Sequence, residues 1–526
     1  MTYNTYKNVF NNKVTPQTEP IPDKDMVKNN AGGYAFQLDK FKQLERFLIL
    51  GTTGGTYYVA QKPLTQENAL VVKACIDEDP QKALDLILDV SDKGRAPSND
   101  PALFALAVAC TNPKSRKQAL AILPKVARIG THLFHFVQYL DGMRGWGRSI
   151  REGVAKWYTE KNTADLAFQM AKYQQRDGWA HGDVLRLAHV KPTSTEQNEM
   201  FAFAVGKSEK SPEYGLLGTM EKLKGATTEQ EIVDIVSGQG GVMEIVPSQW
   251  KNKPAVQKAL LPNLGLTALV RNLGNYGASG LLVQGNWDVL TDIVARLSDE
   301  KAIKKSRIHP MQALMAKLTY DNGHGVRGSN SWEVVPQISQ ALEDLIYKSF
   351  GNVEPTNKKY YIGLDVSGSM RYNYVAGSEL LSCAQASGVM AMTLLRTEPL
   401  VVIKAFSEGV KELPLNKNMS MGDVFGRIRN INFGVTACAL PMLDALKNNI
   451  YVDAFIVITD NETWAGNIHP VQALKQYQNQ INKDAKLIVI GMTSTGFSIA
   501  EQGNPSMLDV VGFDTATPDV IAEFVR

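Results

Sequence analysis

The sequence contains no long hydrophobic run. None of its apolar stretches approaches the roughly 18 residues that a membrane-spanning helix requires. The N-terminus, which reads MTYNTYKNVFNNK, is polar and lacks the apolar core of a secretory signal. The sequence therefore predicts a protein that neither crosses a membrane nor is exported, and we expect it in the cytoplasm.

Cysteines are scarce. The 526 residues include four of them, Cys75, Cys110, Cys383 and Cys438, and no two have the CxxC spacing of a zinc or redox site. Scattered cysteines in an intracellular protein are typical of reduced thiols in the core. A disulfide framework is therefore excluded as the basis of the fold.

A strong net charge is also lacking, because the chain carries +3 overall. Residues 355–526 have 14 Lys and Arg against 16 Asp and Glu, whereas the remainder has 42 against 37. This weak basic excess excludes a uniformly basic surface. Any nucleic-acid site in the first part must be a local cluster.

The C-terminal part alternates strands with helices, which favours a doubly wound α/β sheet of parallel strands. The apolar runs that predict strands are 360–364, 401–406, 455–459 and 486–492. The helical stretches between them are 378–396, 437–448 and 469–480.

The preceding part has apolar residues at helical spacing in many short segments separated by turn signals. These segments are 67–77, 81–90, 102–110, 117–128, 132–140, 163–172, 198–205, 263–273 and 286–297. Helix after helix with short turns indicates stacked antiparallel pairs, as in HEAT-like repeats.

Three domains follow from this organisation. Residues 1–30 contain Pro16, Pro20 and Pro22, which disfavour a helix, so we expect an extended and partly disordered segment. Residues 31–353 form the helical module and 354–526 form the α/β domain.

Five oxygen-bearing side chains form a pattern in the α/β domain. Asp365, Ser367 and Ser369 directly follow one predicted strand, Thr436 lies downstream, and Asp460 ends another strand-like run. Hard divalent cations prefer such oxygens, and parallel sheets hold their sites on loops at the carboxyl ends of strands. The alternative is that Asp365 and Ser367 only cap the next helix.

This pattern resembles the metal-ion-dependent adhesion site of von Willebrand factor A domains. The resemblance implies that Asp365, Ser367, Ser369, Thr436 and Asp460 are the metal ligands, with Mg²⁺ as the expected ion and Mn²⁺ or Ca²⁺ as alternatives. Such sites leave one coordination position for an acidic group of a partner. They bind, and they imply no nucleophile or general base.

Two basic segments of the helical module could contact RNA. The first, 141–151, contains Arg144, Arg148 and Arg151 around Trp146, and arginine pairs with phosphate while aromatic rings stack on bases. The alternative is a loop that leads into a helix, with solvated arginines and with Trp146 and Trp157 in the core.

In the second segment, Lys172 and Arg176 are four residues apart, which predicts that they share a helix face. The next predicted helix, 183–190, puts Arg186 and His189 on one face. Together the four could hold one phosphate backbone. The alternative is an exposed polar face with His189 in or near the core.

Residues 173–192, YQQRDGWAHGDVLRLAHVKP, resemble the signature of the Ro autoantigen family, the RNA-binding proteins with a TROVE module. Further matching stretches are 46–58, 144–148, 269–274 and 308–310. The order of a helical module before an A domain also matches, so the resemblance extends over nearly the whole chain.

The resemblance implies a ring of HEAT-like helical repeats, completed by the A domain, around a central hole. Y RNAs, which are small noncoding RNAs, would bind the basic outer surface through Lys172, Arg176 and His189. Single-stranded 3′ ends of misfolded RNA would enter the hole, with Arg144, Arg148 and Arg151 at the hole or its rim. A ring closed within one chain favours a monomer.

The leading hypothesis is a non-enzymatic RNA-binding protein for RNA quality control, maturation or decay, in which a partner exoribonuclease degrades the RNA. A metal-dependent adhesion scaffold that recruits an acidic partner is the alternative. A nuclease would need a second carboxylate cluster for two metals, and Glu462 is the one extra acid near Asp460.

Overall fold

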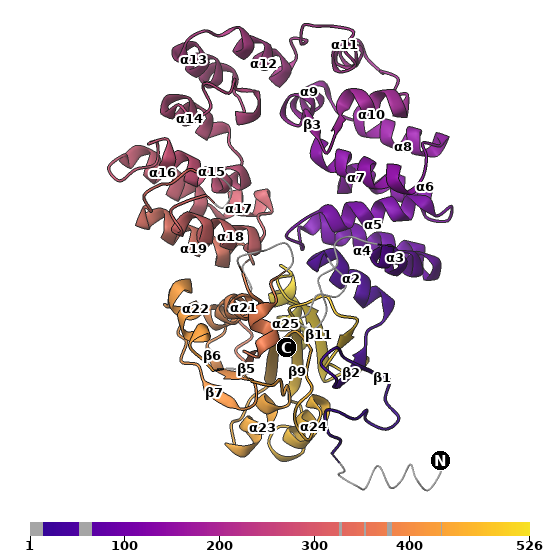
Figure 1. The fold of residues 1–526 in the computed structure, drawn as a ribbon, viewed down its shortest axis with the longest axis vertical. Coiled ribbons are helices and arrows are strands. Elements are labelled where there is room, and N and C mark those ends of the chain that lie inside the picture. The colour runs from indigo at the N-terminus through magenta and orange to yellow at the C-terminus, as the bar shows by residue number, and fades with distance from the viewer. Residues whose placement is uncertain (1–13, 52–65, 326–328, 352–353, 376–380, 433) are drawn as a thin grey trace. The chain divides into compact units, whose positions relative to one another are not determined.

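The computed structural model describes residues 14–51, 66–325, 329–351, 354–375, 381–432 and 434–526 (Figure 1). The chain forms two compact units, Ala69–Ser349 and the combination of Met1–Asn68 with Phe350–Arg526. The predicted disorder of residues 1–13 and the matching residues 52–58 lie outside the described residues.

The unit Ala69–Ser349 is helical, and every predicted helical segment overlaps one of its helices. They are α3 (Gln66–Glu78), α4 (Pro80–Lys93), α5 (Asp100–Thr111), α6 (Arg116–Val126), α7 (Gly130–Met143), α8 (Arg148–Thr159), α9 (Thr163–Lys172), α10 (His181–Ala188), α11 (Thr195–Ala204), α12 (Gly215–Gly225), α13 (Glu229–Gln239), α14 (Pro254–Leu260), α15 (Leu266–Ala278), α16 (Trp287–Ser298), α17 (Glu300–Ser306), α18 (Pro310–Asp321) and α19 (Pro336–Lys348). Short elements join them: the strands β3 (Gln175–Arg176) and β4 (Trp179–Ala180), and the 3₁₀ turns η1 (Met243–Ile245) and η2 (Leu261–Asn263).

Helix α5 shows how these repeats build their core. All residues from Pro101 to Cys110 are buried, because α4, α6 and α7 pack around the helix. A helix that is apolar on all sides is stable only when neighbours cover every face. Each surrounding helix instead buries one stripe, as Ala83, Ile87 and Val90 do in α4.

The helices of this unit close on themselves. Figure 1 shows α5–α11 in one stack and α12–α19 in another. The segment between α17 and α18, with the first turn of α18, contacts the end of α4 and the segment that follows it. There Arg307 lies 3.3 Å from Asp92, His309 Nε2 lies 3.1 Å from the carbonyl of Arg95, and Gln312 donates to the carbonyl of Pro97. The closed series of helices agrees with the predicted ring of repeats.

The other unit contains a six-stranded sheet in the order β11-β9-β8-β5-β6-β7, parallel except for β7. Its strands are β5 (Lys359–Asp365), β6 (Leu400–Phe406), β7 (Val410–Glu412), β8 (Ala454–Thr459), β9 (Lys486–Gly491) and β11 (Met507–Val511). The sequence predicted β5, β6, β8 and β9 and missed the two edge strands.

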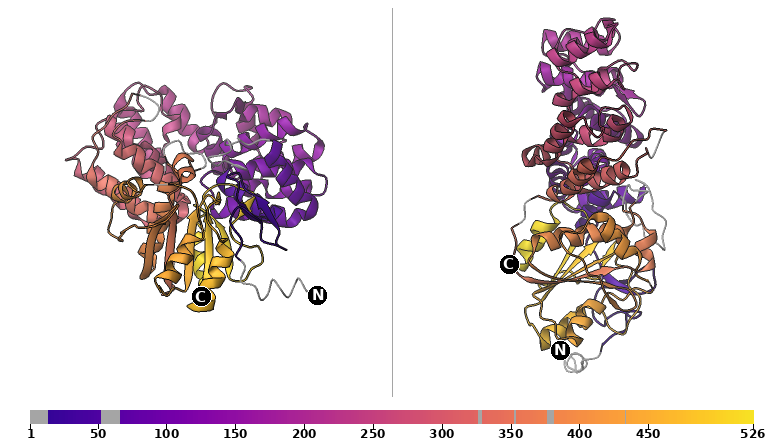
Figure 2. Two further views of the ribbon diagram at one scale, coloured as in Figure 1. Left: turned by 60° about the horizontal axis from the view of Figure 1, so that its bottom comes forward. Right: turned by 90° about the vertical axis from the view of Figure 1, so that its left-hand side faces the viewer.

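Helices cover both faces of this sheet (Figure 2). They are α20 (Gly368–Tyr372), α21 (Cys383–Thr397), α22 (Met421–Arg429), α23 (Leu440–Lys447), α24 (Pro470–Gln480) and α25 (Thr517–Val525). The core under α23 and α24 includes Phe455, Leu487 and Tyr477, all fully buried. The arrangement confirms the predicted doubly wound α/β domain.

The N-terminal segment belongs to the sheet unit. Strand β2 (Tyr34–Gln37) pairs with β1 (Met26–Lys28) on one side and with β10 (Phe497–Ser498) on the other, and α2 (Lys40–Leu50) contacts β11. The sequence placed the chain from residue 31 onward with the helical module, whereas the contacts group the described residues 31–51 with the C-terminal unit. No local pattern signals a pairing between β2 and β10, because more than 400 residues separate them.

Candidate functional site

Two carboxylates meet at the carboxyl ends of adjacent parallel strands. Asp365 ends β5, and Asp460 follows β8 directly. The strands pair in register from Tyr360 opposite Ala454 onward. The Thr459 hydroxyl donates to Asp365 Oδ2 at 2.6 Å, and both carboxylates are fully buried.

The predicted hydroxyl ligands surround these carboxylates. The Ser367 amide donates to Asp365 Oδ1 at 2.9 Å, and the Ser367 and Ser369 hydroxyls lie 3.2 Å apart. Thr436 reaches the same end of the sheet on another loop, where its carbonyl accepts from the amides of Trp464 and Ala465 after β8. Ser367, Ser369 and Thr436 are all buried.

The electrostatics favour a cation between these groups. Burial, and then the neighbouring Asp460 carboxylate, raise the pKa of Asp365 to about 7. Burial also raises the pKa of Asp460, and the nearby Ser369 hydroxyl acts in the opposite direction. Asp460 Oδ2 is buried with no hydrogen-bond partner among the described residues. Such buried carboxylates are costly unless a positive charge compensates them.

The simple capping interpretation does not account for this cluster. Ser367 precedes α20, but its side chain makes no capping hydrogen bond to that helix. Within the described part of the chain, no three His, Cys, Asp or Glu side chains gather as a metal cluster. An all-oxygen set with an unsatisfied carboxylate oxygen fits a hard divalent cation.

Glu462, which the sequence analysis noted as an extra acid near Asp460, is hydrogen-bonded by the N-terminal segment. Its carboxylate accepts from Asn30 Nδ2 at 2.7 Å and from the amide of Ala31 at 3.1 Å. The neighbouring Thr463 carbonyl accepts from Asn29 Nδ2. The segment before β2 therefore fixes the loop that follows Asp460.

The basic segment of the helical unit differs from its prediction. Lys172 and Arg176 do not share a helix face, because α9 ends at Lys172 and Arg176 lies in β3. Asp177 and Gly178 have φ values of 51° and 81° and turn the chain from β3 into β4. An Asp-Gly pair favours this two-residue hairpin turn, so the sequence did contain a local pattern that predicts the hairpin.

Both basic side chains remain accessible. Arg176 is exposed, and its nearest carboxylate is that of Asp177 at 3.6 Å. Lys172 is partly exposed, with its ammonium 5.4 Å from the Phe168 ring centre and 5.5 Å from that of Tyr173. The change from helix to hairpin thus leaves cations and aromatic rings together at the surface.

His189 is exposed and is not in the core. Helix α10 ends at Ala188, so His189 is its left-handed cap with a φ of 49° and not a member of a helix face. Arg186 is also exposed, but it contacts the carbonyl of Val205 at 2.6 Å and Asp183 at 3.5 Å.

The arginines of segment 141–151 differ in their surroundings. Arg148 is 93% exposed and pairs with Glu152, and Arg151 is exposed on the same helix, α8. Arg144 is partly buried, with Nη1 3.3 Å from the carbonyl of Cys110. Trp157 is a fully buried core residue, whereas Trp146 is partly exposed.

His135 links the hairpin to the helical core, and sequence analysis missed it. Its Nδ1 lies 2.6 Å from Asp100 on α5, and its Nε2 lies 3.1 Å from Asp177 in the β3–β4 turn. The hydrogen bond with Asp100 raises the pKa of His135 above its ordinary value. An imidazolium between two carboxylates would fasten the turn that carries Arg176.

The four cysteines are buried and reduced. Burial raises the pKa of Cys110 to about 12 and also raises that of Cys383. These thiols are therefore protonated core groups, as the sequence predicted. Among the described helices, none combines the length and apolar character needed to span a membrane.

The fold and the oxygen site define a protein that joins a module of helical repeats to a von Willebrand factor A domain. Comparison with known families agrees: residues 27–234 and 238–319 match the TROVE domain, and residues 359–525 match the Ro60 vWA domain. The chain belongs to the Ro60 family.

Relatives match along almost the whole chain. The RNA-binding protein RO60 of Deinococcus radiodurans is 40% identical over 97% of both chains, and that of Caenorhabditis elegans is 34% identical over 98% of this chain and 92% of its own. The crystal structure of the Deinococcus radiodurans RO (RSR) protein superposes with a TM-score of 0.70 at 39% identity, covering 93% of this chain and 99% of that one.

Proposed function

We propose that this protein binds RNA through the helical unit. A Y-like small noncoding RNA would lie with its phosphate backbone along Lys172, Arg176 and His189, and single-stranded 3′ ends of misfolded RNA would contact the surface of Arg144, Arg148 and Arg151. The observation that carries the proposal is the β3–β4 hairpin, which holds Arg176 exposed beside Lys172 and its two aromatic neighbours. The names of the two relatives also support it.

The chemistry of these side chains suits RNA and not a protein partner. Phosphate contacts from lysine and arginine supply affinity that falls with salt, while aromatic rings next to them can stack on unpaired bases. Arg186 has two local partners, so it supports the end of α10 and contributes less to binding. The function is RNA quality control, maturation or decay in the cytoplasm, and the protein acts as a monomer.

The A domain holds a divalent metal, with Mg²⁺ first and Mn²⁺ or Ca²⁺ as alternatives, through Asp365, Ser367, Ser369, Thr436 and Asp460. The buried, unpartnered Asp460 Oδ2 supports this assignment. When bound, the ion supplies a coordination position for an acidic group of a partner protein, such as an exoribonuclease. The protein itself is not an enzyme, and RNA cleavage belongs to that partner.

Affinity for a Y-like stem-loop RNA tests the main proposal. The double variant Lys172→Ala/Arg176→Ala removes two phosphate contacts, so we expect roughly a tenfold or greater loss of affinity at moderate salt. Lys301→Ala/Lys305→Ala, on the exposed face of α17, is the matched control and keeps wild-type affinity. Equal affinity of both double variants would overturn the proposed surface.

A metal-dependent adhesion scaffold is the second candidate function, and the Asp365–Asp460 pair favours it. Asp365→Ala separates the two, because it should abolish capture of a metal-dependent protein partner while leaving RNA affinity unchanged. Loss of RNA affinity in Asp365→Ala would contradict this division between the two units.

A further inference from the structure

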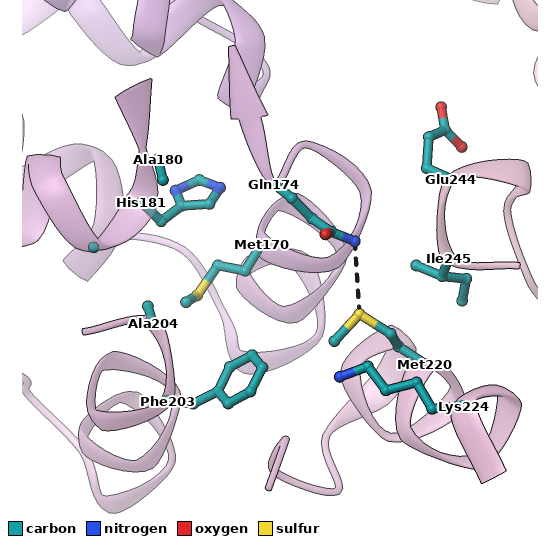
Figure 3. Close-up of a pocket in the computed structure, with 11 residues that line it drawn as sticks. Met170, Gln174, Ala180, His181, Phe203, Ala204, Met220, Lys224, Glu244 and Ile245 are labelled. Atoms are coloured by element: carbon teal, nitrogen blue, oxygen red, sulfur yellow. Dashed lines mark hydrogen bonds between the residues drawn. The ribbon is translucent and has the colours of Figure 1, made fainter. Parts of the chain in front are cut away.

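A pocket opens in the helical unit beside the hairpin. It has a volume of about 310 Å³ and is bounded by the end of α9, the start of α10, the end of α11, α12 and η1. Figure 3 shows Gln174, Phe203 and Lys224 facing this space from the link between α9 and β3, from α11 and from α12. Its volume lies at the lower end of the range for small-ligand sites, which suits a single flat group.

The walls of the pocket combine the phenyl ring of Phe203 with the imidazole of His181, the carboxylate of Glu244 and other polar atoms. Phe203 is partly exposed, and Met170, Met220 and Ile245 complete the apolar lining. Lys224 Nζ lies 5.8 Å from the centre of the Phe203 ring. A base stacked on that ring would therefore have a cation nearby.

Gln174 supplies a directed hydrogen-bond acceptor. Its Nε2 donates to the carbonyl of Ala171 at 3.0 Å and lies 3.7 Å from Met220 Sδ. These contacts orient the amide, so Oε1 is the atom left to accept from a ligand. Each of the four RNA bases carries an N–H donor and a flat ring face that could contact such a wall.

The pocket and the proposed RNA surface share one segment of the chain, because Gln174, which lines the pocket, lies between Lys172 and Arg176 in the sequence. The start of α10 and the end of α11 approach each other closely at one wall of the pocket. A Cβ on Gly182 would clash with the carbonyl oxygen of Ala204. The glycine lets these two helix ends come together.

We propose that this pocket takes one unpaired nucleobase of the bound RNA. The base would stack on Phe203, donate a hydrogen bond to Gln174 Oε1 and lie beside Lys224. This inference rests on the proposed RNA-binding function and adds a specific subsite to it. The phosphates on either side of the base would contact Lys172 and Arg176. The RNA is thereby selected for an unpaired nucleotide, since a base within a duplex cannot leave its stack without cost.

A scan with abasic nucleotides tests the subsite. The probe is a Y-like stem-loop RNA with a short single-stranded tail, in which each unpaired nucleotide in turn lacks its base. For the wild-type protein we expect one position where base removal weakens binding roughly tenfold, the range of one base-to-aromatic stack. In Phe203→Leu, which keeps an apolar side chain but loses the ring, removal at that position should have little further effect.

Two variants complete the test. Gln174→Leu changes an exposed side chain, so it should fold normally and show a partial loss at the same position. Trp287→Leu removes an exposed ring on α16, away from the pocket, and should behave as wild type. If base removal weakens wild type and Phe203→Leu equally at every position, the subsite is wrong although RNA binding stands. If the wild-type protein does not bind the intact probe, the proposed function itself fails.

Discussion

At the residue scale, Asp365 and Asp460 place two carboxylates close together in the interior of the A domain. Both are fully buried at neighbouring strand ends, and burial raises the pKa of each. The penalty for burying an unpaired charge is several kcal/mol after relaxation. A bound cation offsets this penalty, so the site should couple metal binding to stability.

We predict that Mg²⁺ stabilises the A domain against thermal unfolding. At a free Mg²⁺ concentration of about 100 times Kd, the gain is about 2.7 kcal/mol if unfolded chains bind no metal. Asp460→Asn removes a ligand charge and should abolish the gain, whereas the exposed Asp519→Asn in the same unit should retain it. A Mg²⁺-dependent shift of the melting temperature in Asp460→Asn as large as in wild type would contradict the assignment.

His135 should give the helical unit a pH-dependent contribution to stability. Its folded pKa is raised, so the contribution is complete below the unfolded pKa of about 6.5 and is lost as pH rises through the folded pKa. Because the side chain is partly solvent-screened, we expect about 1 kcal/mol or less.

The measurement for His135 is the difference in unfolding free energy between wild type and His135→Gln in urea. It should be larger at about pH 5.5 than at about pH 8.5, on either side of the usual histidine pKa. An equal difference at the two pH values would mean that the contacts with Asp100 and Asp177 do not depend on the imidazolium.

At the element scale, the β3–β4 hairpin replaces the helical turn that was predicted to place Lys172 and Arg176 on one face. The spacing of Lys172 and Arg176 fits a helix, but Tyr173 leaves the helical region with ψ of 65°, and the Asp177-Gly178 turn reverses the chain. The helical periodicity of α9 was real and ended at Lys172 as predicted. Extending it by one turn ignored a two-residue turn signal.

Gly178→Val should disturb the hairpin without creating a steric clash. Gly178 has a φ of 81°, and a Cβ there would meet nothing within 4 Å, so the cost comes from backbone conformation alone. We expect a loss of stability of about 1–2 kcal/mol. Displacement of Arg176 should lower the slope of log affinity against log salt by about 0.9 for one lost phosphate contact.

The readouts for Gly178→Val are urea unfolding and RNA binding over a salt series. Gly206→Val, at a comparable φ of 77° with no atom near its Cβ, is the matched control and should lose stability without changing the salt slope. An unchanged slope in Gly178→Val would separate the hairpin from RNA binding.

The strands that the sequence predicted correctly are long and largely buried, so their apolar runs are easy to recognise. Strands β5 and β8 are apolar almost throughout because helices cover both faces. Strand β7 is three residues long and partly exposed, so it has no such pattern. Asp365, Ser367, Ser369 and Asp460 were predictable because each ends or follows a strand, and Thr436 lies on the loop before α23. Gln174, Phe203 and Lys224 come from the link between α9 and β3, from α11 and from α12, and they share no local motif.

At the scale of the whole molecule, the two ends of the chain stabilise one unit together. Arg46 on α2 is 1% exposed and pairs with Asp509 on β11 through both carboxylate oxygens, at 2.7 and 2.9 Å. Its Nη1 donates to the carbonyls of Thr495 and Phe497. The A domain is thus completed by residues that precede the helical module.

Arg46→Ala should therefore destabilise the A domain strongly. It leaves Asp509 buried without its cation, and breaking a buried pair typically costs about 3–5 kcal/mol. Lys24→Ala is the control, since it removes a more exposed pairing with Glu501 between the same two ends of the chain and should cost about 1 kcal/mol or less. Similar losses for the two variants in thermal unfolding would show that Arg46 does not secure the N-terminal segment.

RNA selectivity over a salt series tests the central claim most directly. We would compare a Y-like stem-loop RNA, a duplex with a single-stranded 3′ tail and the same duplex with blunt ends, with Lys172→Ala/Arg176→Ala alongside the wild-type protein. The account predicts that the tailed duplex binds more tightly than the blunt one, that affinity falls steeply with salt, and that the double variant loses mainly the Y-like RNA. Equal and weak binding of all three RNAs, or no binding at moderate salt, would contradict it.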